Sequence, residues 1–253
     1  HSCIEDADKL DAIPKYHLCI HSRQYMDDDS EALREDSLAR LISLLESIGG
    51  SKVTLIGDTM LDRYHHGFAN NLNSTAPVPV LKIVDSDESP GASAHIAIGL
   101  TSFGMDVSFH TAVGDDDEAS SITTSLKSKD IRIEDIIHVK DRATLTKIRF
   151  FASRESLLDR RQILLQADRG PNETLDESVS SSLTGTALKN IPDSCALVIS
   201  DYDKGVVTKD GAQTLIKAAK NLGIPAIVDP KLTGLEKSRG ATVVIFEKRG
   251  MSL

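Results

Sequence analysis

The stretch VTLIGDTMLDRY at residues 53–64 decides the fold, because a short apolar segment leads directly into charged residues. The segment Val53 to Ile56 is short, mostly apolar and β-branched, which is typical of a buried strand. Gly57-Asp58 ends it, and Asp62 and Arg63 follow. In open α/β sheets, ligands bind outside the carboxyl ends of the strands. The stretch therefore predicts a strand with a binding site beyond its end.

Outward from this stretch, strand-like and helix-like segments alternate along the chain. Further strands are expected over residues 78–84, 107–112, 144–152, 196–200 and 224–228. Helices are expected over residues 30–48, 92–103, 117–128, 173–189 and 209–222. Such alternation indicates a mostly parallel sheet with helices on both faces, so we expect an α/β fold.

Two more expected strands also end in polar clusters, Asp201-Tyr-Asp-Lys204 and Asp229-Pro-Lys231. Carboxylates accept hydrogen bonds from sugar hydroxyls, and lysines bind phosphate. A single aspartate after a strand is usually a helix cap or a turn residue. Three such clusters at one sheet edge favour a site for a polyhydroxylated, phosphorylated ligand.

Composition narrows the class of protein. The 253 residues carry a net charge of −9, from 29 Lys+Arg against 38 Asp+Glu, which argues against a nucleic-acid-coating protein. Aromatic residues make up 4% and tryptophan is absent, so base-stacking platforms are not expected. Three scattered cysteines fit a reducing compartment, and we expect a cytoplasmic protein. No apolar run reaches the roughly 18 residues of a membrane span.

The sequence predicts a short N-terminal extension, followed by one domain that includes a small ribbon. Residues 1–29 are polar and are expected to form a weakly ordered extension, whose cysteines and histidines fit no standard zinc spacing. Residues 30–253 are expected to form one domain. Pro77 and Pro79 exclude a central strand, so residues 68–84 and 144–152 are expected to form a small ribbon outside the main sheet.

An ordered set of motifs resembles the ribokinase-like (PfkB) carbohydrate kinases, and most closely the heptose-7-phosphate kinases among them. The matching segments run from about residue 38 to 242 and include GDTMLDRY at 57–64, APVPV at 76–80, PG at 90–91, GDD at 114–116, TKIR at 146–149, SDYDKG at 200–205, DPK at 229–231 and RGAT at 239–242. The resemblance implies a three-layer sandwich with a mostly parallel sheet and a β-ribbon lid.

The resemblance also implies a reaction and a set of substrate contacts. ATP with Mg²⁺ would phosphorylate a sugar phosphate, with D-glycero-D-manno-heptose 7-phosphate and its anomeric hydroxyl as the best candidate. Asp62 would bind sugar hydroxyls, Gly91 would line the sugar pocket, and Lys147 and Arg149 would face the sugar or its phosphate. The ribbon at residues 76–84 would cover the substrate and could pair two subunits into a homodimer.

The resemblance also implies roles for residues at the carboxyl ends of the expected strands. Asp201 and Lys204 would lie near the transferred phosphate, whereas Asp229 and Lys231 would lie on the nucleotide-facing rim. Two positions depart from the family pattern. Ala92 replaces a usual glycine, and His95 replaces an asparagine that binds the sugar. A core or capping role for the histidine remains open.

The resemblance predicts an incomplete C-terminal part. After Thr242 the family continues into an Asn-x-x-Glu segment and a later Gly-Ala-Gly-Asp motif that carries the catalytic aspartate, and neither appears in residues 243–253. No catalytic residue can therefore be named, and we expect impaired phosphorylation by this chain. The alternative is a non-catalytic remnant that binds a sugar phosphate or dimerises.

Overall fold

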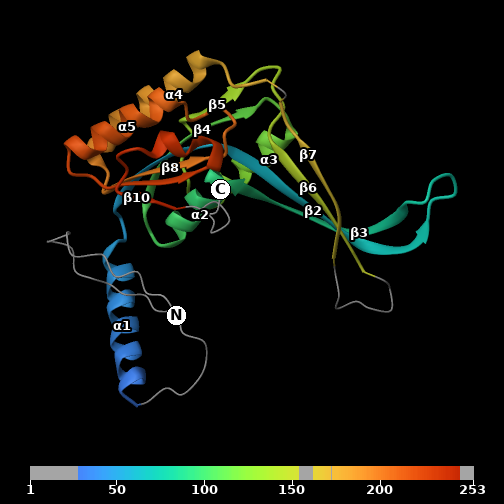
Figure 1. The fold of residues 1–253 in the computed structure, drawn as a ribbon, viewed down its shortest axis with the longest axis horizontal. Coiled ribbons are helices and arrows are strands. Elements are labelled where there is room, and N and C mark those ends of the chain that lie inside the picture. The colour runs from blue at the N-terminus through green and yellow to red at the C-terminus, as the bar shows by residue number, and fades with distance from the viewer. Residues whose placement is uncertain (1–27, 154–161, 172, 246–253) are drawn as a thin grey trace. The chain divides into compact units, whose positions relative to one another are not determined.

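The computed structural model describes residues 28–153, 162–171 and 173–245 (Figure 1). By compactness the chain divides into two units, His1–Glu46 and Ser47–Leu253, and each is described by itself.

The described part of the first unit is helix α1 (Asp28–Ser47), close to the helix expected over residues 30–48. Apart from residues 28 and 29, the expected extension over 1–29 lies outside the described residues, so the boundary at residue 30 stays a prediction. No helix among the described residues is both long enough and apolar enough to cross a membrane.

The core of the second unit is a six-stranded sheet in the order β10-β9-β8-β1-β4-β5, and every neighbouring pair is parallel. This sheet confirms the predicted mostly parallel α/β fold. Its strands are β1 (Lys52–Gly57), β4 (Asp106–Gly114), β5 (Ile136–Val139), β8 (Ala196–Asp201), β9 (Ala226–Pro230) and β10 (Val243–Val244).

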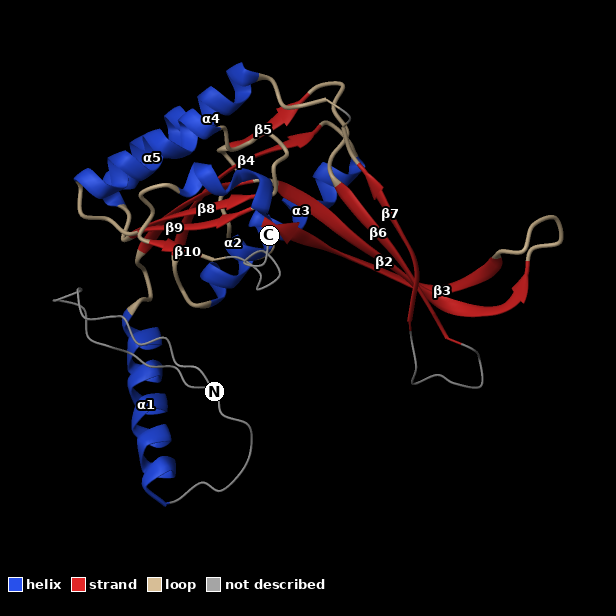
Figure 2. Ribbon diagram, in the orientation of Figure 1, coloured by secondary structure: helices blue, strands red, loops and turns tan. Residues whose placement is uncertain are grey.

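Helices cover both faces of this sheet and complete three layers (Figure 2). Leu55 packs with Phe109 and Ile122 on the face covered by α2 and α3, whereas the next residue, Ile56, packs with Leu215 on the face covered by α4 and α5. All five side chains are buried. The helices are α2 (Ser93–Ser102), α3 (Asp117–Lys127), α4 (Glu177–Asn190) and α5 (Lys209–Asn221), with 3₁₀ helices η1 (Ile191–Asp193) and η2 (Leu232–Ser238).

A second sheet, in the order β3-β2-β6-β7, extends away from the helices (Figure 2). Its strands β2 and β6 are parallel, and the outer pairs are antiparallel. Most of the residues expected in the ribbon, 68–84 and 144–152, lie in β2, β3 and β6. The strands are β2 (Thr59–Leu72), β3 (Pro79–Ala92), β6 (Thr146–Ser153) and β7 (Gln162–Arg169).

Strand β3 lies at one edge of the second sheet, where Pro79 and Pro90 are tolerated because an edge strand has a side that needs no ladder hydrogen bonds. Exposed apolar side chains occur on both edge strands, including Ile83 on β3 and Ile163 and Leu165 on β7. The homodimer expected through this ribbon stays a prediction.

Ion pairs fix the base of the second sheet to helix α3. Arg63 on β2 donates to Glu88 on β3 at 3.1 Å and to Glu118 on α3 at 3.3 Å. Arg169 on β7 reaches the same Glu118 carboxylate at 2.7 Å. Arg63 and Arg169 thus join β2 and β7 to this one helix through the Glu118 carboxylate.

Candidate functional site

The carboxyl ends of the parallel strands meet at one edge of the main sheet, as expected for an α/β site. Only Asp58 separates the end of β1 at Gly57 from the start of β2 at Thr59, so the second sheet starts at this same edge. The strand-end residues Asp58, Asp201 and Pro230 therefore lie beside the base of the second sheet.

Asp58 organises the loop that follows β8. Its Oδ2 accepts hydrogen bonds from the backbone N–H groups of Tyr202 at 2.8 Å and Lys204 at 3.0 Å, and its Oδ1 accepts from Val206 at 3.1 Å. Burial raises the pKa of the Asp58 carboxyl, although the amides of Lys204 and Val206 act against that rise. Asp58 thus holds the loop that carries Lys204.

Asp201, expected near a transferred phosphate, is buried and paired within the protein. Lys237 of η2 contacts its Oδ2 at 2.8 Å, and the Asp203 amide donates to its Oδ1 at 3.0 Å. The same ammonium donates to Asp203 Oδ1 at 3.2 Å and to the Val207 carbonyl at 3.0 Å. The Asp201 carboxylate therefore holds this loop to η2, and any role toward substrate stays a prediction.

Asp62 and Arg149 lie together on one face of the second sheet. Arg149 Nη1 donates to Asp62 Oδ1 at 2.7 Å and to the Tyr64 hydroxyl at 3.3 Å. Its guanidinium also lies over the Tyr64 ring, 5.4 Å from the centroid. The two residues that the sequence assigned to sugar contacts thus form an ion pair, in which one carboxylate oxygen is already occupied.

Gly91 is required by the position of Asp62. A Cβ at residue 91 would collide with Oδ2 of Asp62 and come to 3.1 Å from the Cγ of Met60. Glycine at this position therefore lets the carboxylate lie against the β3 backbone. His95 lies exposed on the first turn of α2, and its sugar-binding role stays a prediction.

Ala92 has a strained backbone, with φ at +52° and ψ at −129°, a conformation that glycine adopts at little cost. We expect Ala92→Gly to raise the free energy of unfolding by about 1 kcal/mol, since relief of strain exceeds the added chain entropy. Urea unfolding measures the change. The matched control is Ala94→Gly in helix α2, which should lower stability by at least about 1 kcal/mol, because a buried methyl group is lost together with helix propensity. Equal losses in both variants would contradict the assigned strain.

A cleft of about 210 Å³ separates the second sheet from the loop after β8. Lys147 of β6 and Lys204 of the loop line it, as do Asp168 and Arg169 at the end of β7. The Lys147 ammonium also lies 5.7 Å from the centroid of the Tyr202 ring. Three cationic side chains and one carboxylate thus face a small polar cavity, which suits a ligand with a phosphate and hydroxyl groups.

Asp229 and Lys231 lie at the end of β9, outside this cleft. Asp229 is in register with Ser200 of β8, and the Lys231 amide donates to the Asp201 carbonyl at 2.7 Å. They lie on the same sheet edge as the β8 loop, and their assignment to a nucleotide stays a prediction.

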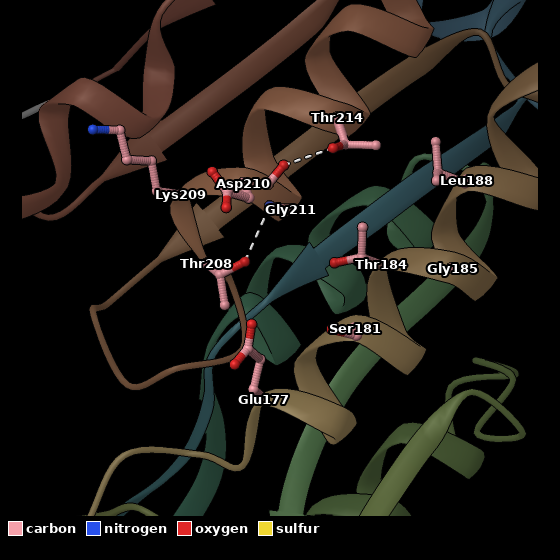
Figure 3. Close-up of a pocket in the computed structure, with 10 residues that line it drawn as sticks. All are labelled: Glu177, Ser181, Thr184, Gly185, Leu188, Thr208, Lys209, Asp210, Gly211 and Thr214. Carbon is pink, nitrogen blue, oxygen red and sulfur yellow. Dashed lines mark hydrogen bonds between the residues drawn. The ribbon is translucent and has the colours of Figure 1, made fainter.

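A larger cavity, about 440 Å³, lies between helices α4 and α5 (Figure 3). Two of its hydroxyls serve helix α5 itself: Thr208 caps α5 by accepting from the Gly211 amide at 3.0 Å, and Thr214 donates to the Asp210 carbonyl at 2.7 Å. None of the sequence-predicted site residues lines it. Its size alone does not make it the functional site.

Known proteins resemble this chain in sequence and in fold. No protein-family profile matches it. The Bifunctional protein HldE of Actinobacillus pleuropneumoniae serotype 5b is 35% identical over 194 residues, which are 77% of this chain. That of Haemophilus ducreyi is also 35% identical over 194 residues. This chain spans 38% of the length of each of these two relatives.

Solved carbohydrate kinases share the fold. The tetrameric inhibited form of phosphofructokinase-2 from Escherichia coli is similar in structure, with a TM-score of 0.60 and 17% identity. The match covers 80% of this chain and 63% of the phosphofructokinase chain. Ribokinase from Arabidopsis thaliana, complexed with ribose and ATP, is also similar in structure, with a TM-score of 0.57 and 13% identity. The match covers 80% of this chain and 62% of the ribokinase chain. The chain has the fold of these ribokinase-like carbohydrate kinases and is similar in sequence to HldE. The sequence resemblance is thereby confirmed.

Three residues of this site are not predicted from the sequence. Asp168 and Arg169 lie on β7, where the run QILLQADR lacks the strict alternation that marks a half-buried strand. Lys237 lies 36 positions from its partner Asp201, and nothing in the sequence joins them. The DPK and RGAT motifs flank η2 in the sequence, and they could have indicated that this segment lies near the sheet edge.

Proposed function

We propose that this chain binds a sugar phosphate as part of a carbohydrate kinase that phosphorylates it with ATP. D-glycero-D-manno-heptose 7-phosphate is the best candidate, with its anomeric hydroxyl as acceptor, in line with the resemblance to heptose-7-phosphate kinases. The observation that carries the proposal is the cleft in which Lys147 and Lys204 face a carboxylate.

Charge complementarity supports this assignment. Lys147 reaches the cleft from β6 of the second sheet and Lys204 from the loop after β8, so a phosphate between them would join the second sheet to the strand ends of the main sheet. Hydrogen bonds between an ammonium and phosphate oxygens are among the stronger ones in proteins. A closed, water-poor cleft would hold the sugar in a fixed orientation for transfer, which is the main contribution that a kinase makes.

The nucleotide belongs to the same proposal. When bound, Mg·ATP supplies the phosphoryl group and neutralises its charge. Asp229 and Lys231, at the end of β9, are the proposed contacts on the nucleotide side. Within residues 28–153, 162–171 and 173–245, no three His, Cys, Asp or Glu side chains converge as metal ligands. These residues do not by themselves fit a magnesium ion, and the chemistry proposed for them is binding and orientation.

Calorimetric titration of the 253-residue chain with D-glycero-D-manno-heptose 7-phosphate tests the proposal. We expect Lys147→Met to weaken binding about 10- to 100-fold, because a charged hydrogen bond contributes about 1.5–3 kcal/mol. The matched control is Lys217→Met, an exposed lysine on α5 that does not line the cleft, which should bind normally. Absence of binding by the unsubstituted chain, or equal affinity of the two variants, would refute the assignment. Release of ADP in the presence of Mg·ATP distinguishes a kinase from a non-catalytic binding protein.

A further inference from the structure

We propose that Arg142 is the positioning residue for Lys204, so that the phosphate affinity of the cleft depends on a side chain outside it. The inference rests on the proposed function, because it concerns how one lysine of the same phosphate site is held. Arg142 lies between β5 and β6. The described residues that line the cleft of about 210 Å³ include Lys204 and not Arg142. Arg142 therefore acts through the loop after β8 rather than on the ligand.

The backbone on both sides of Lys204 has an unusual conformation. Asp203 has φ at +59° and Gly205 has φ at +103°, so a left-handed residue stands before the lysine and another after it. Such a conformation persists only where the surrounding structure fixes it. Lys204 itself is exposed, so packing of its side chain does not fix the loop. The loop therefore depends on hydrogen bonds to neighbouring segments.

Two side chains of opposite charge hold the backbone of Lys204. Asp58 Oδ2 accepts from the Lys204 N–H at 3.0 Å, and Arg142 Nη2 donates to the Lys204 carbonyl oxygen at 3.2 Å. Hydrogen bonds in which one partner is ionised are roughly twice as strong as those between neutral groups. Because both its donor and its acceptor are bonded, the Lys204 backbone is fixed, and its side chain starts from a defined point at the edge of the cleft.

The guanidinium of Arg142 joins the loop to a third segment. Its Nη1 donates at 3.2 Å to the carbonyl oxygen of Glu173, between β7 and α4. A planar guanidinium can serve two carbonyls at once in a fixed geometry, whereas an ammonium is a point charge on a flexible stem. Asp58, Arg142 and Lys204 also line a common cavity of about 10 Å³, which has room for about one water molecule at most. Arg142 is thus engaged with the protein, which is what a positioning role requires.

The test is a double-mutant cycle on the full chain, read by calorimetry with D-glycero-D-manno-heptose 7-phosphate and with inorganic phosphate. Arg142→Met should weaken binding of both ligands about 10-fold or more, because the displaced lysine loses a charged hydrogen bond to phosphate. In a chain that already carries Lys204→Met, the same change should alter either affinity by less than about 2-fold. A role limited to folding would weaken binding in both backgrounds and would overturn the inference.

Two further variants keep the cycle interpretable. Arg142→Lys retains the positive charge beside Asp58 but lacks the guanidinium fork, so it should unfold at the parent's thermal midpoint and still bind both ligands more weakly. It takes the place of Arg142→Met in the cycle if the methionine variant does not fold. Arg132→Met is the control, because Arg132 is exposed and pairs with Asp106 at 2.8 Å; both affinities should stay unchanged.

The outcomes separate the two proposals. If the unsubstituted chain binds neither ligand, the proposed function fails and this inference falls with it. If it binds and the folded Arg142 variants retain full affinity, the inference alone is overturned. A loss that depends on the presence of Lys204, in variants that unfold at the parent's midpoint, supports Arg142 as the residue that positions this lysine.

Discussion

Asp58→Asn is expected to lower the free energy of unfolding by about 2–4 kcal/mol. Asp58 is fully buried and accepts three backbone hydrogen bonds, from Tyr202, Lys204 and Val206. An asparagine offers only one acceptor oxygen, so its amide NH₂ must face at least one backbone donor. Each buried donor left without an acceptor costs about 1–3 kcal/mol.

Urea unfolding measures this loss, with Asp115→Asn as the control. Asp115 is exposed at the end of β4, on the same sheet edge, and its substitution should change stability by less than about 0.5 kcal/mol. An Asp58→Asn variant as stable as this control would show that the loop after β8 holds its shape without the carboxylate.

The pH dependence of this loss has a defined sign. Burial raises the folded-state pKa of Asp58 above the 3.8 of an unperturbed aspartate. A group with a raised folded-state pKa contributes stability that is present in full below the unfolded pKa and declines as the pH rises through the folded one. The difference in stability between the parent chain and Asp58→Asn should therefore have its full value at and below pH 3.8 and should shrink as the pH rises above it.

The main sheet could be predicted because its strands are buried on both faces. Segments such as Val53–Ile56 and Ala196–Ser200 are short apolar runs, and helices at regular intervals separate them. The second sheet is harder to read. Residues 57–64 resemble a polar turn after a strand, yet β2 begins at Thr59 and runs to Leu72. Polar residues occur there because one face of the sheet meets a cleft.

The candidate site was predictable where motifs marked it. Asp62, Lys147 and Arg149 were assigned to one substrate from the resemblance, and the register of β2 and β6 brings them together. Which of them pair could not be read from the sequence. An ion pair such as that of Arg149 with Asp62 joins residues 87 positions apart, and only the strand register shows that it forms. Asp168 was not predicted for the same reason. Only its pairing with Lys147 on β6 shows which face of the sheet it shares.

Lys237→Met is expected to have the largest effect on stability, a loss of about 3–5 kcal/mol. Lys237 is mostly buried, and its ammonium lies 2.8 Å from the Asp201 carboxylate. The Asp201 side chain has no exposed surface. Removing one partner of a buried ion pair leaves the other charge without compensation, and that cost is about 3–5 kcal/mol. The 3.0 Å hydrogen bond to the Val207 carbonyl is lost as well.

The same 3₁₀ region offers a matched comparison. Lys209 pairs with Glu236 at the same 2.8 Å, but both side chains are more than half exposed. An exposed ion pair contributes about 0–1 kcal/mol, so Lys209→Met should be nearly neutral. Lys237→Arg keeps the charge and should recover most of the stability that methionine removes. Equal effects of Lys237→Met and Lys209→Met in urea unfolding would show that the Asp201 pair adds nothing to the fold.

The pH profile provides a second measurement of the same pair. Burial acts to lower the pKa of Lys237, but the hydrogen bonds and charges of Asp201 and Asp203 outweigh it, and the folded-state pKa rises above the 10.5 of an unperturbed lysine. A raised lysine pKa gives stability that is complete below the unfolded pKa and is lost as the pH rises through the folded one. The stability gap between the parent chain and Lys237→Met should therefore stay constant through neutral pH and close only above about pH 10.5. A stability gap that closed near pH 7 would show that a group other than Lys237 titrates with the loss. It would contradict the role of Lys237 in holding the β8 loop to η2.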